Sequence, residues 1–377
     1  MKIGIVCYPT FGGSGVVATE LGMALADNGH EVHFITYNQP VRLDFLSHKL
    51  HFHQVLIEEY PLFQYQPYEL ALSTRMVDVV ERYQLEVLHV HYAIPHAYAA
   101  YMAKQMLLEK GIKIKVVTTL HGTDITLVGS HPTYKAAVEF SINNSDVVTA
   151  VSNNLKETTN QLFKIDKAIQ VVYNFIDIKK YDRAQDEECK RGALAKSNER
   201  ILTHISNFRP VKRVEDVVRV FYEVQKEIPS KLLLIGEGPD RVLAEKLTKK
   251  LGIKNKVFFL GNSTEIDKIL CYTDVFLLPS KTESFGLAAL EAMAAKTPVI
   301  STNTGGLPEV NIHGETGFLS NLGDVKDMAM NAISILKDDV VLEQFKQRAK
   351  EHTKKFSLQN ILPVYEDIYK SCYKSKV

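Results

Sequence analysis

The sequence lacks three features that would point to other classes of protein. No apolar run approaches the ~18 residues that a membrane span needs. The 45 basic and 44 acidic residues leave a formal net charge of +1, so no strong one-sign field favours nucleic acid or an anionic membrane as a partner. The N-terminus reads Met-Lys followed by a short apolar strand, without a signal-peptide cleavage site. We therefore expect a cytoplasmic protein that acts on small molecules.

Cysteine is also scarce. The four cysteines are far apart and form no CxxC pair: Cys7, Cys189, Cys271 and Cys372. Closely spaced pairs are typical of structural zinc sites and of small disulfide-rich domains. We expect reduced thiols, with neither structural zinc nor a disulfide framework.

The chain is long enough for two domains, since it has 377 residues and domains average ~150 residues. Apolar strand patterns recur in both halves, at 2–9, 31–38, 86–92, 115–122, 146–152, 200–208, 231–238, 256–262, 274–280 and 297–303. Helical patterns such as 16–29, 214–228 and 285–295 alternate with them. This alternation predicts an α/β fold of two doubly wound, Rossmann-like domains, with ligands in an interdomain cleft at the carboxyl ends of the strands. We expect the domains at 1–166 and 167–356, with a final helix, 357–377, packing back on the first.

A glycine-rich turn, 12–15, joins the first strand to the first helix. Backbone amides at such a helix start attract phosphate or carboxylate groups, so we expect Gly13 to face an anion. Gly13, Gly15 and Ala18 also fit the dinucleotide fingerprint. That fingerprint requires an acidic residue after the second strand, but this strand ends Thr36-Tyr37-Asn38. An anion-facing loop is therefore favoured over a dehydrogenase site or a plain tight turn.

The segment 282–291 lies where a strand hands over to a helix. Ser284 is expected to cap this helix. The amides expected to face an anion are those of Phe285, Gly286 and Leu287. Glu283 would accept hydrogen bonds from sugar hydroxyls and Glu291 from a ribose. Two solvated helix glutamates are the alternative, because the spacing alone is a weak signal.

Basic residues follow the first strand of the second half, in the run Asn207-Phe208-Arg209-Pro210-Val211-Lys212-Arg213. Cations at the carboxyl end of a strand are suited to a diphosphate. A solvated basic loop is the alternative. Gly236 and Ser263 follow two later strands and suit close approach to a base or ribose.

His121 ends a strand of the first domain, in the same expected cleft as Gly13, which favours a role near the reacting sugar. His89, His91 and His96 have the spacing HxHxxxxH, which matches no strong zinc pattern. We expect no metal there.

At these residues the chain resembles the retaining glycosyltransferases of family 4, which have the GT-B fold. The runs 282–310 and 313–319 are highly specific to that family, and the resemblance covers essentially the whole chain. The finer features at 2–22, 89–97, 118–129 and 206–213 resemble the members that act first in bacillithiol biosynthesis. The resemblance implies UDP-N-acetylglucosamine as donor and L-malate as acceptor. It also implies front-side attack without a cofactor or divalent metal.

Residue by residue, the resemblance places His121, Lys212 and Glu283 at the reacting sugar and diphosphate. It places Glu291 at the ribose. Many relatives carry an arginine at the position of Asn207, and here Arg209, two residues on, is expected to supply that charge. The expected acceptor contacts are Ser14, Tyr92, Thr119, Thr123 and Asn153, of which Tyr92 matches a tyrosine of the related mycothiol-pathway enzyme.

Three other functions stay open at this point. A family 4 transferase with a glycan or lipid acceptor would differ only in the acceptor. A UDP-N-acetylglucosamine epimerase would convert the donor with no acceptor present. A non-catalytic nucleotide-sugar sensor would bind UDP without releasing it from a donor.

Overall fold

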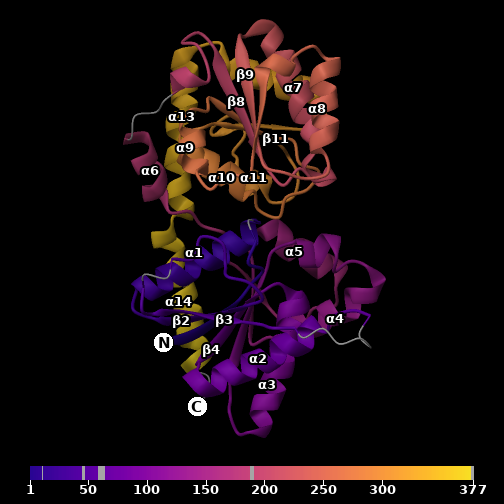
Figure 1. The fold of residues 1–377 in the computed structure, drawn as a ribbon, viewed down its shortest axis with the longest axis vertical. Coiled ribbons are helices and arrows are strands. Elements are labelled where there is room, and N and C mark those ends of the chain that lie inside the picture. Colours follow the sequence, from indigo (N-terminus) through magenta and orange to yellow (C-terminus); the bar gives the residue numbers. More distant parts are fainter. Residues whose placement is uncertain (11, 45–46, 58–63, 187–190, 375–377) are drawn as a thin grey trace. The chain divides into compact units, whose positions relative to one another are not determined.

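The computed structural model describes residues 1–10, 12–44, 47–57, 64–186 and 191–374. The chain divides into two compact units, unit 1 with Met1–Asn174 and Gln359–Val377, and unit 2 with Phe175–Leu358 (Figure 1). The last helix, α14 (Leu358–Lys374), thus returns to unit 1. The division falls after residue 174 rather than after 166, because the short strand β7 (Ile169–Val171) still pairs with β6 (Val147–Ala150) of the first sheet.

Unit 1 is built on a parallel sheet of seven strands in the order β3-β2-β1-β4-β5-β6-β7. The other strands are β1 (Lys2–Val6), β2 (Glu31–Thr36), β3 (Leu50–Gln54), β4 (Val87–His91) and β5 (Lys115–Leu120). The helices are α1 (Gly13–Asp27), α2 (Tyr68–Tyr83), α3 (Tyr98–Glu109), α4 (Pro132–Asn143) and α5 (Asn153–Leu162). Because every recorded pair is parallel, the carboxyl ends of these strands lie at one edge of the sheet.

Unit 2 repeats the plan with six parallel strands in the order β10-β9-β8-β11-β12-β13. They are β8 (Arg200–Ile205), β9 (Ser230–Ile235), β10 (Val257–Gly261), β11 (Val275–Leu278), β12 (Val299–Thr302) and β13 (Gly317–Ser320). The helices are α6 (Ile178–Asp186), α7 (Val214–Glu227), α8 (Arg241–Lys250), α9 (Ile266–Cys271), α10 (Leu287–Ala294), α11 (Leu307–Val310), α12 (Val325–Leu336) and α13 (Asp339–Thr353). The expected doubly wound α/β architecture is confirmed for both units.

Helix α7 illustrates how the sequence pattern creates the core. Its buried apolar residues recur at helical spacing, at Val214, Val217, Val218, Val220, Phe221 and Val224. They join Leu232 and Leu234 of β9 in one buried cluster. Each such side chain contributes ~1.5–3 kcal/mol when fully buried, so this one face ties the helix firmly to the sheet.

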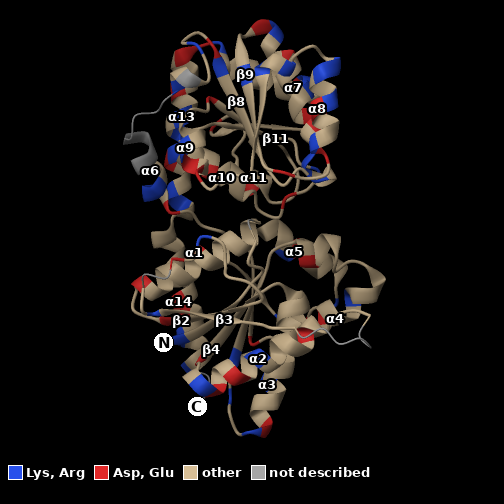
Figure 2. Cartoon of the chain, in the orientation of Figure 1, with Lys and Arg blue, Asp and Glu red and all other residues tan. Residues whose placement is uncertain are grey.

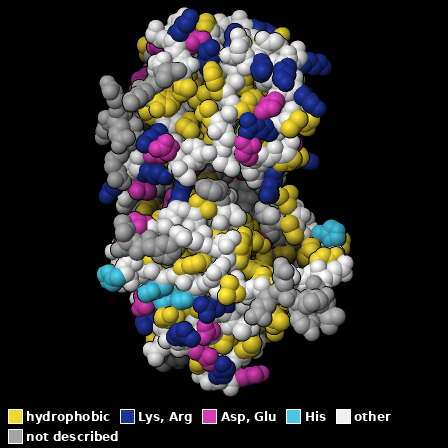
Figure 3. All heavy atoms as spheres, viewed as in Figure 1, with side chains coloured by type: hydrophobic (Ala, Val, Ile, Leu, Met, Phe, Trp, Pro, Cys, Tyr) yellow, Lys and Arg dark blue, Asp and Glu magenta, His cyan; other side chains and the backbone are white. Residues whose placement is uncertain are grey.

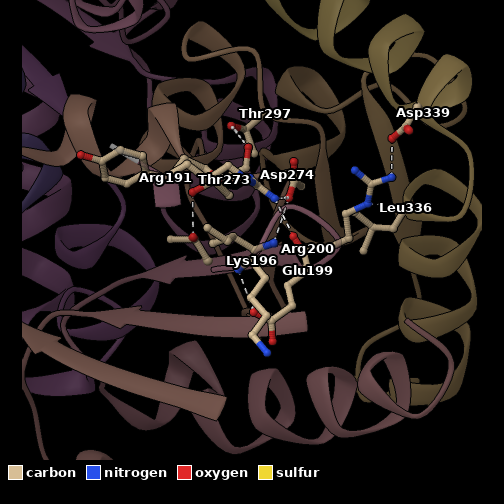
Figure 4. Close-up of polar contacts among 12 residues, drawn as sticks. Arg191, Lys196, Glu199, Arg200, Thr273, Asp274, Thr297, Leu336 and Asp339 are labelled. Carbon is tan, nitrogen blue, oxygen red and sulfur yellow. Dashed lines mark hydrogen bonds and ion pairs between the residues drawn. The ribbon is translucent and has the colours of Figure 1, made fainter. Parts of the chain in front are cut away.

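In each unit an acidic residue joins the amino ends of the two central strands by hydrogen bonds. In unit 2, Asp274 precedes β11 and accepts the Ile201 N–H at 2.8 Å, while its own N–H donates to Ile201 O at 2.8 Å (Figure 4). Arg191 adds an ion pair to the Asp274 carboxylate at 2.7 Å. In unit 1, Glu86 precedes β4 and exchanges the same two bonds with Lys2, at 2.7 and 2.9 Å. These contacts fix strand register at the ends away from the candidate site.

Charged residues of both signs occur in both units. Acidic and basic residues are interspersed along the ribbon of both units in Figure 2. Over the residues that the structure describes, no helix has the length and apolarity needed to cross a membrane.

Cys7 and Cys372 are buried free thiols, and burial raises the pKa of Cys7 to about 12. Cys271 is disulfide-bonded, so the expectation of four reduced thiols is wrong for this residue, while Cys189 lies outside the described residues.

Candidate active site

Two charged residues of unit 2 meet where β8 and β11 end. Lys212 Nζ lies 2.5 Å from Glu283 Oε1, and the side chains are only 22% and 14% exposed. Ser280 Oγ donates to the same carboxylate oxygen at 2.8 Å. The two loops are joined directly, since Lys281 N–H donates to Val211 O at 2.8 Å. The structure therefore brings together a cation and an acid that the sequence places far apart.

The loop that carries Lys212 is held by a buried histidine. His204 Nδ1 bonds to Leu277 O at 2.8 Å, and because a carbonyl only accepts, this nitrogen carries the proton. His204 Nε2 is then the acceptor for Ser206 Oγ at 2.8 Å, and Ser206 Oγ accepts the Phe208 N–H at 3.2 Å. Burial lowers the pKa of His204 to about 4, so this histidine is neutral near pH 7.

The cations of this loop have different environments. Arg213 pairs with Asp216 in the first turn of α7, at 2.5 Å. Its charge therefore stabilises the helix start. Arg209 and Asn207 are exposed at the carboxyl edge of β8. Of the cations expected at the diphosphate, Lys212 and Arg209 remain the candidates.

Helix α10 begins later than expected. Its first residue is Leu287, and Gly286 caps it with φ 100° and no side-chain bond. The left-handed φ at Gly286 favours glycine, and a Cβ there would also lie 2.6 Å from Leu307 Cδ2. The prediction that Ser284 is the cap is therefore wrong. Phe285 is buried and packs edge-on against Phe356, while Glu291 lies half-buried inside the helix.

Gly236 and Ser263 lie at the same edge of the sheet. Gly236 follows β9 with φ 124°, and its N–H donates to Gly261 O at 2.8 Å. Ser263 follows β10, and its Oγ accepts the Glu265 N–H at 3.1 Å. Their assignment to a base or ribose stays a prediction.

In unit 1, helix α1 starts directly at Gly13, inside the glycine-rich turn. A Cβ at Gly15 would lie 2.5 Å from Tyr8 O and 2.6 Å from Thr10 O. The helix start therefore packs against the preceding loop at a distance that only glycine permits. Gly13 is exposed at this edge, and its phosphate role stays a prediction.

Ser14 and Tyr92, two of the residues expected at the acceptor, form a hydroxyl cluster. Ser14 Oγ lies 2.6 Å from the Tyr92 hydroxyl. Thr123 follows β5 and is exposed. Tyr92 follows β4 with φ 91°, a strained conformation for a non-glycine residue. Burial raises the pKa of Tyr92, so its phenol keeps its proton near pH 7.

His121 is paired with His91 beside this cluster. His91 Nδ1 and His121 Nε2 are 2.8 Å apart, and the rings of Tyr92 and His121 have centroids 5.3 Å apart. Burial, reinforced by His96, lowers the pKa of His121 to about 3. His121 is therefore a neutral hydrogen-bonding group near pH 7 rather than an imidazolium.

Asp124 is a residue that sequence reasoning missed. Its carboxylate accepts the N–H groups of Ala93 and Gly122, at 2.8 and 2.9 Å, and so joins the loops after β4 and β5. Burial raises its pKa to about 6, against the opposing effect of these bonds. A signal was present in the run His121-Gly122-Thr123-Asp124, because an aspartate side chain in a turn often bonds to nearby backbone groups.

Two expected acceptor residues have other environments. Thr119 is fully buried, and its hydroxyl is 2.7 Å from both His89 Nε2 and Thr149 Oγ1. It belongs to a core network that reaches Tyr369 of α14 through His89, and the acceptor role expected of it stays a prediction. Asn153 is exposed at the start of α5, where its amide donates to the Tyr173 hydroxyl at 2.8 Å.

Comparisons with known proteins identify the family to which this chain belongs. The family described as "Glycosyltransferase Family 4" matches residues 11–180, and "Glycosyl transferases group 1" matches 185–352. The chain is 49% identical over 370 residues to the N-acetyl-alpha-D-glucosaminyl L-malate synthase of Bacillus anthracis, covering 98% of this chain and 96% of that protein. The chain belongs to the family 4 glycosyltransferases.

Solved structures support the fold of this glycosyltransferase. The sucrose-phosphate synthase of Thermosynechococcus elongatus matches with a TM-score of 0.80 at 20% identity, covering 100% of both chains. The Anabaena protein HepE, solved with UDP and glucose, matches with a TM-score of 0.80 at 19% identity, covering 98% of this chain and 100% of that one. The expected GT-B architecture is thus confirmed.

Proposed function

We propose that this glycosyltransferase transfers N-acetylglucosamine from UDP-N-acetylglucosamine to the hydroxyl of L-malate, with retention at the anomeric carbon. This is the first step of bacillithiol biosynthesis. The observation that carries the proposal is the 49% identity, over 98% of the chain, to a relative named for this product. The matched region spans both units.

Unit 2 supplies the donor contacts in this proposal. Lys212 and Arg209 contact the diphosphate, and Glu283 accepts hydroxyl hydrogen bonds from the transferred sugar. In the structure Lys212 and Glu283 are each other's partners at 2.5 Å. Donor binding therefore replaces this ion pair with a phosphate contact for Lys212 and hydroxyl hydrogen bonds for Glu283.

Unit 1 supplies the acceptor contacts. Ser14, Tyr92 and Thr123 present hydroxyls that donate to malate carboxylates. A hydrogen bond to a charged group is worth only ~1.5–3 kcal/mol, so several are needed for a dianion. His121 is neutral, which suits a hydrogen bond to the sugar and not the delivery of a positive charge to the phosphate.

The proposed reaction is a front-side displacement. The malate hydroxyl oxygen forms a bond to the anomeric carbon as the bond from that carbon to the β-phosphate oxygen breaks. The departing phosphate oxygen takes the hydroxyl proton, and UDP leaves with the bonding electron pair. Lys212 and Arg209 stabilise the charge that develops on UDP, which is the role a divalent metal has in other transferases.

UDP release, measured with and without malate, tests the function. We expect release from UDP-N-acetylglucosamine to depend on malate and to saturate with it. Donor conversion without an acceptor would indicate an epimerase. UDP binding without release would indicate a sensor, and release dependent on a glycan or lipid would indicate another family 4 activity. Each of these outcomes would contradict the proposal.

A further inference from the structure

Histidines gather at the amino end of the unit 1 sheet, away from the candidate site. β2 and β3 form one edge of this sheet, and His33 is paired in register with His51. Side chains two residues apart on a strand share a face, so Glu31 lies on the same face as His33. Histidine side chains reach the surface of this unit beside charged side chains in Figure 3.

Three potential metal-ligand atoms converge there. Glu31 Oε1 lies 3.2 Å from His33 Nε2 and 3.4 Å from His51 Nε2. All three atoms lie within 4.8 Å of one another, and among the described residues no other group of three or more His, Cys, Asp or Glu side chains is so placed. Ligands bound tetrahedrally to zinc at ~2.0–2.1 Å are ~3.4 Å apart, close to the two distances from Glu31 Oε1.

The surroundings orient the buried ligand. His33 is fully buried, and its Nδ1 lies 2.9 Å from His53 Nε2. A metal-binding histidine usually donates its other ring N–H to a fixed acceptor, and His53 is in place to accept it. The rings of His33 and His51 stack at 4.5 Å, and Tyr83 packs against His33 at 4.7 Å.

The other two ligands are accessible to solvent. The side chains of Glu31 and His51 are 33% and 34% exposed. Lys2 Nζ lies 3.7 Å from the second carboxylate oxygen, Oε2, which leaves Oε1 directed at the histidines. A cation held here keeps an open position for water, in the two-histidine, one-carboxylate arrangement that zinc proteins use.

We propose that Glu31, His33 and His51 bind a divalent zinc-class cation. Glu31 begins β2 and Ser14, Tyr92 and His121 follow the opposite ends of the strands, so this cation takes no part in sugar transfer. It crosslinks the edge strands β2 and β3. The inference stands apart from the proposed function.

The test uses the full-length protein, freed of metal with a chelator and then desalted. We expect one equivalent of Zn²⁺ to bind in competition with a chromophoric chelator and to raise the melting temperature. Co²⁺ should give the intense visible absorption of a tetrahedral site. Glu31→Gln and His51→Ala alter partly exposed residues, and each should weaken Zn²⁺ binding at least tenfold and abolish the melting shift. His131→Gln, an exposed histidine elsewhere in unit 1, is the matched control.

Wild-type Zn²⁺ affinity in both Glu31→Gln and His51→Ala, or no stoichiometric binding by the unaltered chain, would overturn the proposal. His53→Phe should keep one equivalent of Zn²⁺ but bind it ~10–100-fold more weakly, because the removed group only orients His33. Malate-dependent UDP release should be unchanged in Glu31→Gln and His51→Ala. If the unaltered chain transfers no sugar, the proposed function is contradicted. The Zn²⁺ measurements still decide the metal site independently.

Discussion

Lys212 and Glu283, expected to bind opposite ends of the donor's reacting bond, form an ion pair with each other at 2.5 Å. Each side chain is mostly buried, so each needs a partner before the substrate arrives. Ser280 and the contact between Lys281 and Val211 hold the pair in place. Under the proposed function, the donor would replace the ion pair between the two side chains.

Lys212→Ala should lower the turnover of UDP-N-acetylglucosamine by ~10²–10³, because a contact to charge that develops in the transition state is worth that much. The measurement is the malate-dependent rate of UDP release at saturating substrates. Lys281→Ala removes an exposed neighbouring lysine and is the control, with a rate near wild type. A loss of less than about threefold in Lys212→Ala would exclude the phosphate role, since it is far below that magnitude.

Glu283→Gln should lower turnover by ~10-fold or more, since the removed charge strengthens hydrogen bonds to the transferred sugar. UDP affinity should change little, because the glutamate contacts the sugar and not the nucleotide. Steady-state kinetics and UDP titration calorimetry measure the two quantities separately. An equal loss in both would place Glu283 at the nucleotide.

Tyr92→Phe and Ser14→Ala should each raise the malate Michaelis constant while leaving UDP binding nearly unchanged. The two hydroxyls are 2.6 Å apart, so the double variant should cost less than the sum of the single changes. Ser130→Ala, in the exposed part of the same unit, is the matched control. Normal malate saturation in both single variants would place the acceptor elsewhere.

Stability should fall steeply in acid. Burial lowers the pKa values of His89 and His121 to about 3 and of His96 and His204 to about 4. The unfolded chain binds these protons near pH ~6.5, so folding is favoured fully above that pH and loses stability as the pH falls toward the folded values. Each histidine contributes a slope of about 1.4 kcal/mol per pH unit. Asp124, whose pKa is raised to about 6, offsets part of this loss.

Urea unfolding between pH 7.5 and 5 measures this slope directly. Nitrogen chemical shifts of the His204 ring, recorded over the same range, should report a neutral imidazole throughout. A stability that does not change with pH, or protonation of His204 near pH 6, would contradict a buried, neutral His204.

Treatment with EDTA should leave malate-dependent UDP release intact, because cationic side chains take the role of a metal at the diphosphate. EDTA can inhibit by removing a catalytic metal or by removing the cation proposed at Glu31. The Glu31→Gln variant distinguishes these two causes. If EDTA inhibits the unaltered chain and that variant equally, metal-free catalysis is contradicted.

The sequence predicted the central strands and the amphipathic helices because their apolar spacing is strong. It missed β3, β7 and β13, which lie at the edges of the sheets. β3 carries three polar residues out of five, and β7 has only three residues, so neither has a clear apolar pattern.

The site was predicted in part. Short-range patterns placed Glu283, Lys212 and Tyr92 at the ends of strands, where the structure has them. Side-chain direction could not be predicted at Thr119, because its buried partners come from β4 and β6, distant in the sequence. Ser284 failed as a cap because α10 begins at Leu287, with the left-handed Gly286 at the cap position.

The most direct test of the account is the product formed from UDP-N-acetylglucosamine and L-malate by the purified chain. Proton magnetic resonance of the reaction should show one new α-anomeric N-acetylglucosamine linked to malate for each UDP released. Free N-acetylglucosamine, its epimer or a β-linked product in place of that signal would contradict retaining transfer to malate.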